Sequence, residues 1–214
     1  MSVTSAVPRD QAISRILELT TRPAARAEKP WLVVTAGLPA SGKSTFGRKL
    51  ARATGAAVLE SDALRTALFG APTHTKEESH RLFDALYGAA GRLLQDGCSV
   101  IVDATNLRER DRERAYAVAE ASGAGLLLLH FRAPAAVITE RLDRRSSGGD
   151  PDDRSTAGLA IYNRMAETEE PIRRQHWRID TSDAAATEAA LQRAIETLIP
   201  IHAAKSRDTG GSIS

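Results

Sequence analysis

The stretch "WLVVTAGLPASGKST", residues 31–45, joins an apolar run of strand length to a glycine-rich loop. Residues 31–36 predict a strand that is buried on both faces, as in a parallel sheet. From about Lys43 to Thr54 the apolar residues take helical spacing, so a helix is expected directly after the loop. The sequence therefore places two glycines and a lone lysine between a buried strand and the first turn of a helix.

The loop Gly37-Leu-Pro-Ala-Ser-Gly42-Lys43-Ser44 matches the phosphate-binding pattern of a glycine, four residues and Gly-Lys-Ser/Thr. Its glycines allow backbone amides to turn inward around a phosphate, and the following helix adds unpaired amides. Lys43 can reach the β- and γ-phosphates, and the Ser44 hydroxyl is a ligand for Mg²⁺. The expected cofactors are ATP and Mg²⁺, and the alternative is a structural glycine turn with an incidental lysine. The residues expected to bind ATP are Gly37, Pro39, Ala40, Ser41, Gly42, Lys43, Ser44 and Thr45.

Four further apolar runs alternate with helical patterns along the chain, which is typical of an α/β protein with a parallel sheet. The runs are "AAVLES" (56–61), "CSVIVDATN" (98–106), "AGLLLLHFRAP" (124–134) and "HWRIDTS" (176–182). The predicted fold is a three-layer αβα arrangement around a five-stranded parallel sheet. Residues 1–30 are expected to form an appended helix and a linker, residues 31–202 the main domain, and residues 203–214 a flexible tail.

Ligands bind at the carboxyl ends of the strands in parallel sheets. In this chain the residues at the ends of four predicted strands are Gly37 to Ser44, Ser61 and Asp62, Asp103 to Asn106, and Arg132. Asp62 is placed to orient and deprotonate an alcohol, and Arg65, one helical turn later, to neutralise phosphoryl oxygens. The alternative is that Ser61 or Asp62 only caps the next helix. Asp103 has the position of a carboxylate that holds Mg²⁺ directly or through water. Thr105 and Asn106 have the alternative role of helix caps.

Two arginine-rich segments lie farther along the chain. In "ITERLDRRSSGGD" (138–150), Arg141, Arg144 and Arg145 share one helical face beside a Gly-Gly segment, which suggests a helical arginine lid over the transferring phosphate. A solvated arginine cluster is the alternative. The charges of "RERDRERAYAVAEA" (108–121) are expected to form a solvent-exposed helix face.

The overall composition excludes few partners. The formal net charge of +2, from 29 basic and 27 acidic residues, is too small to indicate nucleic acid or an anionic membrane. No run is long and apolar enough to span a membrane, so no membrane association is expected. Cys98 is the single cysteine, which excludes an internal disulfide and favours the cytoplasm. The five histidines have no metal-ligand spacing, and none is assigned a role.

The motifs "GLPASGKST", "ESDALR", "IVDATNLRERDR" and "ITERLDRR" follow one another in the order found in a known family. From about Leu32 to Ser182 the chain resembles the P-loop kinase domain of polynucleotide 5′-hydroxyl kinases and their bacterial relatives. The resemblance implies a P-loop NTPase fold of the adenylate-kinase-like group. It also implies Asp62 as general base, Arg65 at the phosphates, Asp103 on the acceptor side or the metal, and lid arginines. The loop motif and the resemblance together assign a catalytic role to Lys43, Asp62, Arg65, Arg141 and Arg145, and a role as metal ligands to Ser44 and Asp103.

Three functions remain open at this stage. The first is an ATP- and Mg²⁺-dependent kinase that phosphorylates an alcohol, with a polynucleotide 5′-hydroxyl, and hence single-stranded nucleic acid ends, as the first acceptor to test. The second is a kinase for a small molecule such as an antibiotic, a sugar or a nucleotide-type acceptor. The third is a non-catalytic ATP-binding module that regulates a partner.

Overall fold

The computed structural model describes residues 8–22, 26–146 and 160–199. The sheet has five parallel strands in the order β2-β3-β1-β4-β5, which confirms the predicted sheet. The strands are β1 (Trp31–Ala36), β2 (Ala57–Glu60), β3 (Val100–Asp103), β4 (Gly125–Arg132) and β5 (Trp177–Asp180). Because all five run in the same direction, their carboxyl ends lie at one edge of the sheet.

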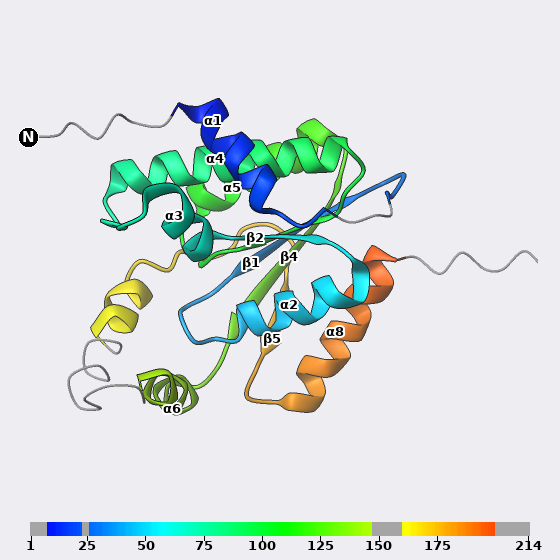
Figure 1. Cartoon of the computed structure of the whole chain (residues 1–214). Helices are drawn as coiled ribbons and strands as arrows, with labels where there is room; N and C mark the ends of the chain where they lie inside the picture. Colours follow the sequence, from blue (N-terminus) through cyan, green and yellow to red (C-terminus); the bar gives the residue numbers. More distant parts are fainter. Residues whose placement is uncertain (1–7, 23–25, 147–159, 200–214) are drawn as a thin grey trace, which may run out of the picture.

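Helices cover both faces of the sheet and complete three layers (Figure 1). They are α1 (Arg9–Leu19), α2 (Lys43–Thr54), α3 (Ser61–Phe69), α4 (Lys76–Gln95), α5 (Glu109–Ser122), α6 (Ala135–Ser146) and α8 (Ala184–Leu198), and residues 160–166 are also helical. α2 and α8 pack on one face, and α1, α4 and α5 lie on the other. The α/β fold predicted from the sequence is therefore correct.

The alternation of side chains along β1 divides the core in two. Leu32 and Val34 belong to the apolar cluster beneath α1, α4 and α5, while Val33 belongs to the cluster beneath α2 and α8. All three are fully buried. A strand that is apolar on both faces can be covered only by helices on both sides, which is why the run at residues 31–36 is informative about the fold.

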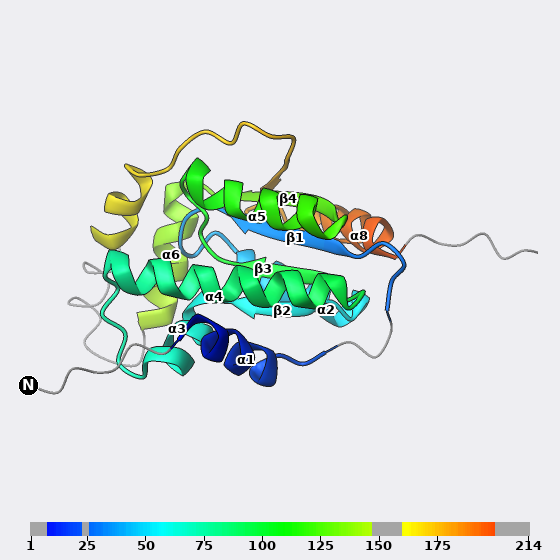
Figure 2. The same ribbon diagram turned by 90° about the horizontal axis from the view of Figure 1, so that it is seen from above.

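α1 packs against α4 on the outside of one helical layer (Figure 2). Its Ile13 and Ile16 side chains are buried at 1% and 0% exposure. Gly88 of α4 permits this close approach, since a Cβ there would lie 2.5 Å from Cδ1 of Ile13. The domain boundary proposed at residue 30 would thus place α1 outside the main domain, although the apolar face of α1 is part of the same core.

The charged residues of α5 do not form a wholly solvent-exposed face as predicted, because Arg112 and Glu109 are buried at 1% and 8% exposure. The predicted flexible tail (203–214) and the Gly-Gly segment of the lid lie outside the described residues, as does the side chain of Arg145. In the part of the chain that the structure describes, no helix is long and apolar enough to cross a bilayer.

Candidate active site

The loop between β1 and α2 has backbone angles that suit anion binding. Gly37, Ala40 and Gly42 have φ angles of 131°, 60° and 91°, and α2 begins at Lys43 as predicted. A Cβ on Gly37 would lie 2.4 Å from the carbonyl oxygen of Phe131, so only glycine fits there. The loop therefore packs against the end of β4, and the first turn of α2, whose backbone amides can bind an anion, follows directly.

Lys43 lies within this loop. Its Nζ donates a hydrogen bond to the carbonyl oxygen of Leu38 at 2.7 Å and lies 3.5 Å from Oγ of Ser41. The lysine is 7% exposed, so the loop shields its ammonium group from bulk water. An ammonium group in this position strengthens the electrostatic attraction for a phosphate bound to the loop amides.

The segment after β3 supports the loop from the side. The Gly37 amide donates to the carbonyl oxygen of Thr105 at 2.9 Å, and the Asn106 side-chain amide donates to the carbonyl oxygen of Thr35 at 2.7 Å. The Thr35 hydroxyl lies 3.3 Å from Oδ1 of Asp103. Because α5 starts only after Arg108, the alternative that Asn106 caps this helix is wrong.

Asp62 lies in the first turn of α3. The helix is preceded by Glu60 and has no side-chain cap, so the capping role considered for Ser61 and Asp62 is wrong. Asp62 is exposed, and within residues 8–22, 26–146 and 160–199 its carboxylate makes no hydrogen bond or ion pair. This carboxylate is thus open to a ligand.

These groups line one cleft of about 1120 Å³. From the β1 loop and the strand ends it is lined by Pro39, Ala40, Gly42, Lys43, Ser44, Asp62, Arg65, Asp103 and Thr105. A further wall comes from α4, the start of α5 and residues 160–166. Of the predicted ATP-binding residues, Gly37, Ser41 and Thr45 do not line it; the first two are buried in the loop and Thr45 is exposed on α2.

Arg65 lines the cleft, and its guanidinium group is held by side chains of α4. Its side chain is 8% exposed, and one guanidinium nitrogen donates to Oε1 of Glu78 at 2.6 Å while another donates to Oγ of Ser79 at 3.3 Å. The third nitrogen, Nε, is buried and has no hydrogen-bond partner in the described part of the chain. The role at the phosphates predicted for Arg65 stays a prediction.

Glu78 organises the surroundings of Arg65. Its carboxylate also accepts hydrogen bonds from the amide and hydroxyl of Thr73 at 2.6 and 2.7 Å, and from the amide of His74. Burial alone would raise the pKa of Glu78, but these bonds and the one from Arg65 outweigh it and lower the pKa to about 2. Glu78 is therefore an anion at neutral pH that joins α3, α4 and the turn between them.

The lid arginines have different surroundings. Arg141 donates to the carbonyl oxygen of Ala40 at 3.2 Å and to the hydroxyl and carbonyl oxygens of Thr181 at 2.8 and 2.7 Å. Arg144 is exposed and pairs with Glu140 of the same helix at 2.6 Å. Arg141 thus ties α6 to the phosphate-binding loop and to the residue after β5, whereas its delivery to a phosphate stays a prediction.

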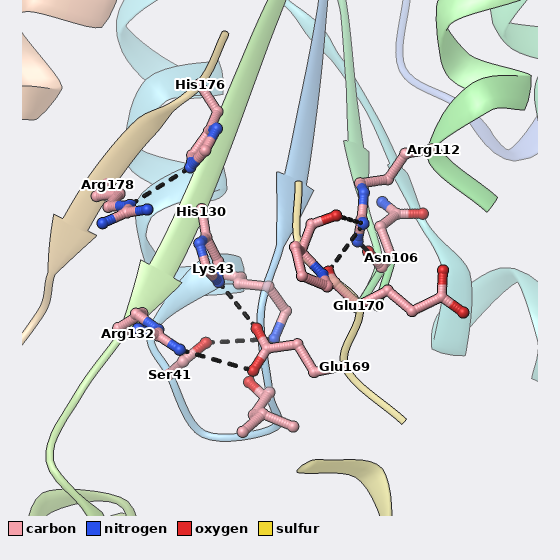
Figure 3. Close-up of polar contacts among 12 residues, drawn as sticks. Ser41, Lys43, Asn106, Arg112, His130, Arg132, Glu169, Glu170, His176 and Arg178 are labelled. Atoms are coloured by element: carbon pink, nitrogen blue, oxygen red, sulfur yellow. Dashed lines mark hydrogen bonds and ion pairs between the residues drawn. The ribbon is translucent and has the colours of Figure 1, made fainter. Parts of the chain in front are cut away.

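A second group of polar residues lies beside the loop (Figure 3). Arg112 is 1% exposed and donates to Oε2 of Glu109 and to the carbonyl oxygens of Asn106, Glu170 and Pro171, at 2.7 to 3.0 Å. It therefore connects α5 to the segment that supports the loop and to the chain after residues 160–166.

His130 of β4 is paired with the same part of the chain. Its Nε2 lies 2.9 Å from Oε1 of Glu169, whose other oxygen is 3.9 Å from Arg132 (Figure 3). Burial lowers the pKa of His130, although the hydrogen bond with Glu169 opposes this shift. No role was predicted for this histidine, and the structure shows a packed polar contact between β4 and residue 169.

The residues predicted to hold Mg²⁺ fit that ion. Ser44 and Asp103 line the same cleft as Lys43 and offer a hydroxyl and a carboxylate oxygen. Mg²⁺ prefers oxygen ligands and keeps several waters, so two protein ligands are enough when phosphate oxygens supply others. Among the described residues no group of three or more histidine, cysteine or carboxylate side chains forms another metal site.

Sequence reasoning missed two residues that contribute to the site, Glu78 and Thr181. Thr75 and Glu78 have the Thr-x-x-Glu spacing that marks a helix start, and the Thr75 hydroxyl accepts from the Glu78 amide at 3.2 Å. That signal indicates where α4 begins but not the partner of Glu78. Thr181 directly follows β5, so the rule that sites gather at carboxyl ends of strands was enough to indicate it.

Several solved structures have a fold similar to that of this chain. A 1.70 Å structure from Chloroflexus aurantiacus, of a protein provisionally named as a kinase, is 25% identical with a TM-score of 0.61 and covers 80% of this chain and 100% of its own. A gluconokinase from Sinorhizobium meliloti 1021 is 24% identical, with a TM-score of 0.52, over 81% of this chain and 97% of its own. APS kinase CysC from Mycobacterium tuberculosis, in complex with AMPPNP and APS, is 21% identical, with a TM-score of 0.55, over 79% and 98%.

Among curated proteins no sequence matches the chain. The profile of the family described as "AAA domain" matches residues 32–172, which include the phosphate-binding loop, Asp62, Asp103 and Arg141. Since this match covers more than half of the chain, the protein belongs to the AAA domain family and has a P-loop kinase-like fold.

Proposed function

We propose that this protein is a kinase that transfers the γ-phosphoryl group of ATP to a hydroxyl group of an acceptor, with Mg²⁺ as cofactor. The observation that carries the proposal is the carboxylate of Asp62. It is exposed, has no partner in the described residues, and lines the same cleft as Lys43 and Ser44. A triphosphate on the loop and a hydroxyl at Asp62 would then share one cleft, as phosphoryl transfer requires.

The residues have distinct roles in the proposed reaction. Loop amides and Lys43 hold the β- and γ-phosphates, and Asp62 accepts the proton of the acceptor hydroxyl as its oxygen bonds to the γ-phosphorus. The bond from that phosphorus to the bridging oxygen breaks, and ADP leaves. Ser44, and Asp103 directly or through water, would hold Mg²⁺, which would supply charge neutralisation for the phosphates.

Two kinases of similar fold support a small acceptor. Gluconokinase and APS kinase are named for small-molecule acceptors, and the latter was crystallised with APS. We therefore favour the small-molecule alternative over a polynucleotide 5′-hydroxyl. Roles for Arg65, Arg141 and Arg145 at the transferring phosphate remain part of the proposal, as does the cytoplasmic location.

The substitution Asp62→Asn tests the proposal. Loss of a general base typically lowers the rate by about 10²- to 10⁴-fold, and we expect a fall of kcat in this range with any acceptor that the protein phosphorylates. The dissociation constant for ATP should change less than about threefold, since Asp62 does not belong to the loop. The measurement is transfer of labelled γ-phosphate to a panel of sugars, nucleosides, aminoglycosides and oligonucleotides.

Lys43→Ala is the comparison variant because it weakens nucleotide binding in every version of the hypothesis. A non-catalytic ATP-binding module would lose ATP affinity in Lys43→Ala, transfer phosphate to no acceptor, and be indifferent to Asp62→Asn. That combination of results would overturn the proposed function.

A further inference from the structure

We infer that the acceptor is a small molecule that carries an additional anionic group, bound by Arg108, Arg164 and Lys76 on the cleft wall formed by α4, the start of α5 and residues 160–166. The inference rests on the proposed function and specifies its substrate class. It follows from the distribution of charge and apolar surface over that wall.

The cleft is lined by seven lysine or arginine side chains and four carboxylates, so its wall has a surplus of positive charge. Lys43 and Arg65 belong to the side formed by the loop and α3. The remaining five come from the start of α4, the start of α5 and residues 160–166. They are Lys76, Arg108, Arg110, Arg114 and Arg164.

Two of these five are already paired with carboxylates. Arg114 lies 3.0 Å from Oδ1 of Asp84, and Arg110 lies 3.8 Å from Oδ1 of Asp111. Arg108, Arg164 and Lys76 form no hydrogen bond or ion pair through their side chains within the described ranges. Among these five cations, Arg108, Arg164 and Lys76 are therefore the ones that an anionic ligand can bind without breaking an existing side-chain contact.

Arg108 is the most informative of the three because it is partly buried. It directly precedes α5, whose first turn starts at Glu109. Removing a guanidinium from water without a partner is unfavourable, and an anionic ligand removes that penalty while it gains charge-assisted hydrogen bonds. The side chain is thus pre-placed for a phosphate, sulfate or carboxylate group.

Apolar side chains on the same wall favour a small acceptor over a polynucleotide. Phe83, Ile161 and Met165 line it, and Phe83 is the single Phe, Tyr or Trp residue among the described residues of the cleft. A single-stranded polynucleotide is normally held by several aromatic rings on which successive bases stack. One ring with two aliphatic neighbours suits one sugar ring or one base, so we favour a small anionic molecule.

The first test measures binding of inorganic phosphate while the loop is filled with Mg²⁺ and a non-hydrolysable ATP analogue. Isothermal titration should show saturable phosphate binding to the full chain. Arg108→Gln should weaken this binding by about tenfold or more, as expected for a hydrogen bond to a charged group. Arg15→Gln is the matched control, because Arg15 is half-exposed on α1 and outside the cleft.

The second test compares acceptors that differ only in charge. Gluconate and glucose 6-phosphate are paired with glucose, and nucleoside monophosphates with nucleosides, in the γ-phosphate transfer assay. We expect the charged member of a pair to have a KM at least about tenfold lower, and Arg108→Gln and Arg164→Gln to remove that advantage while kcat stays within about threefold.

The outcomes distinguish a failure of the proposed anion subsite from a failure of the proposed kinase activity. If the ATP analogue binds but phosphate does not, or if Arg108→Gln and Arg15→Gln bind it equally, the inference is wrong while the proposed kinase activity stands. Phosphorylation of oligonucleotides in preference to every small acceptor would also overturn it. If no acceptor in either panel receives phosphate but phosphate binding depends on Arg108, the anion subsite stands and the proposed function fails.

Discussion

Arg65 illustrates how a buried partner changes the interpretation of a single residue. Its spacing from Asp62 predicts a side chain directed at the transferring phosphate. In the structure its guanidinium is also bonded to Glu78, thirteen residues away on the next helix. A rigidly held arginine loses less conformational entropy on meeting a phosphate than a mobile one does. We therefore regard Glu78 as a residue that positions Arg65.

The pH dependence of stability tests this arrangement. The pKa of Glu78 is lowered from 4.5 to about 2, so its ionised form stabilises the fold above about pH 4.5 and this contribution is lost as pH falls towards 2. Glu78→Gln should lower the unfolding temperature at pH 7. The difference between the two proteins should shrink progressively between about pH 4.5 and 2, as followed by thermal unfolding with circular dichroism.

Glu77 provides the matched control because it is exposed on the same turn of α4. Glu77→Gln should leave the unfolding temperature almost unchanged at every pH. A Glu78→Gln protein whose loss of stability is the same at pH 3 and pH 7 would show that the Glu78 carboxylate is not the ionised partner of Arg65.

Sequence reasoning located residues whose position depends on local order. The glycine loop and Lys43 belong to a continuous motif, Asp103 ends β3, and Asp62 lies two residues after β2. Glu78 was not predictable because its partners, Arg65 and Thr73, come from another helix and from the turn before α4. Nothing in the spacing of a single chain shows which distant charges will meet.

At the scale of elements, α5 is joined to its surroundings through Arg112. This side chain reaches the carbonyl oxygens of Asn106 and Glu170, and its guanidinium pairs with Glu109 one turn earlier on the same helix. The side chain of Asn106 in turn bonds to Thr35 of β1. These contacts connect Arg112 with the strand that precedes the phosphate-binding loop.

Removal of this arginine should be strongly destabilising. Arg112→Met leaves Glu109 buried without its partner and three carbonyl oxygens without a donor, and we expect a loss of about 3 kcal/mol in the free energy of unfolding. Arg110→Met, on the same helix but 68% exposed, should cost less than about 0.5 kcal/mol. Urea denaturation of both variants makes the comparison, and equal losses would contradict the role of Arg112.

The bounds of β1 and α2 were predictable, whereas the other four apolar runs extend one to three residues beyond their strands. The strand at residues 31–36 and the helix Lys43–Thr54 agree with the structure residue for residue, because the apolar run and the change of period are strong signals. The burial of Arg112 was not predictable from α5 itself, where it stands among other charges. Its burial depends on residues 170 and 171, which the fold brings back onto this helix.

At the scale of the whole molecule, the strand order places the phosphate-binding loop at the centre of the sheet. β1 lies between β3 and β4, so the loop is flanked by Asp103 on one side and by Arg132 on the other. Asp62 follows β2, one strand beyond β3. Parallel strands and helical crossovers therefore assemble the cleft from segments that are far apart in sequence.

The helix α1 lies before the domain boundary proposed at residue 30, yet it packs against α4 of the main domain. We expect Ile16→Ala to lower the free energy of unfolding by about 2 to 5 kcal/mol, because its fully buried side chain packs in the core cluster shared with α4. Leu19→Ala, at the exposed end of α1 and 46% exposed, should cost less than about 1 kcal/mol. ATP affinity should be unchanged in both, since α1 does not line the cleft. If Ile16→Ala unfolds in urea at the same midpoint as the unsubstituted protein, α1 is an appendage to residues 31–202, whereas the expected loss makes it an integral layer of that domain.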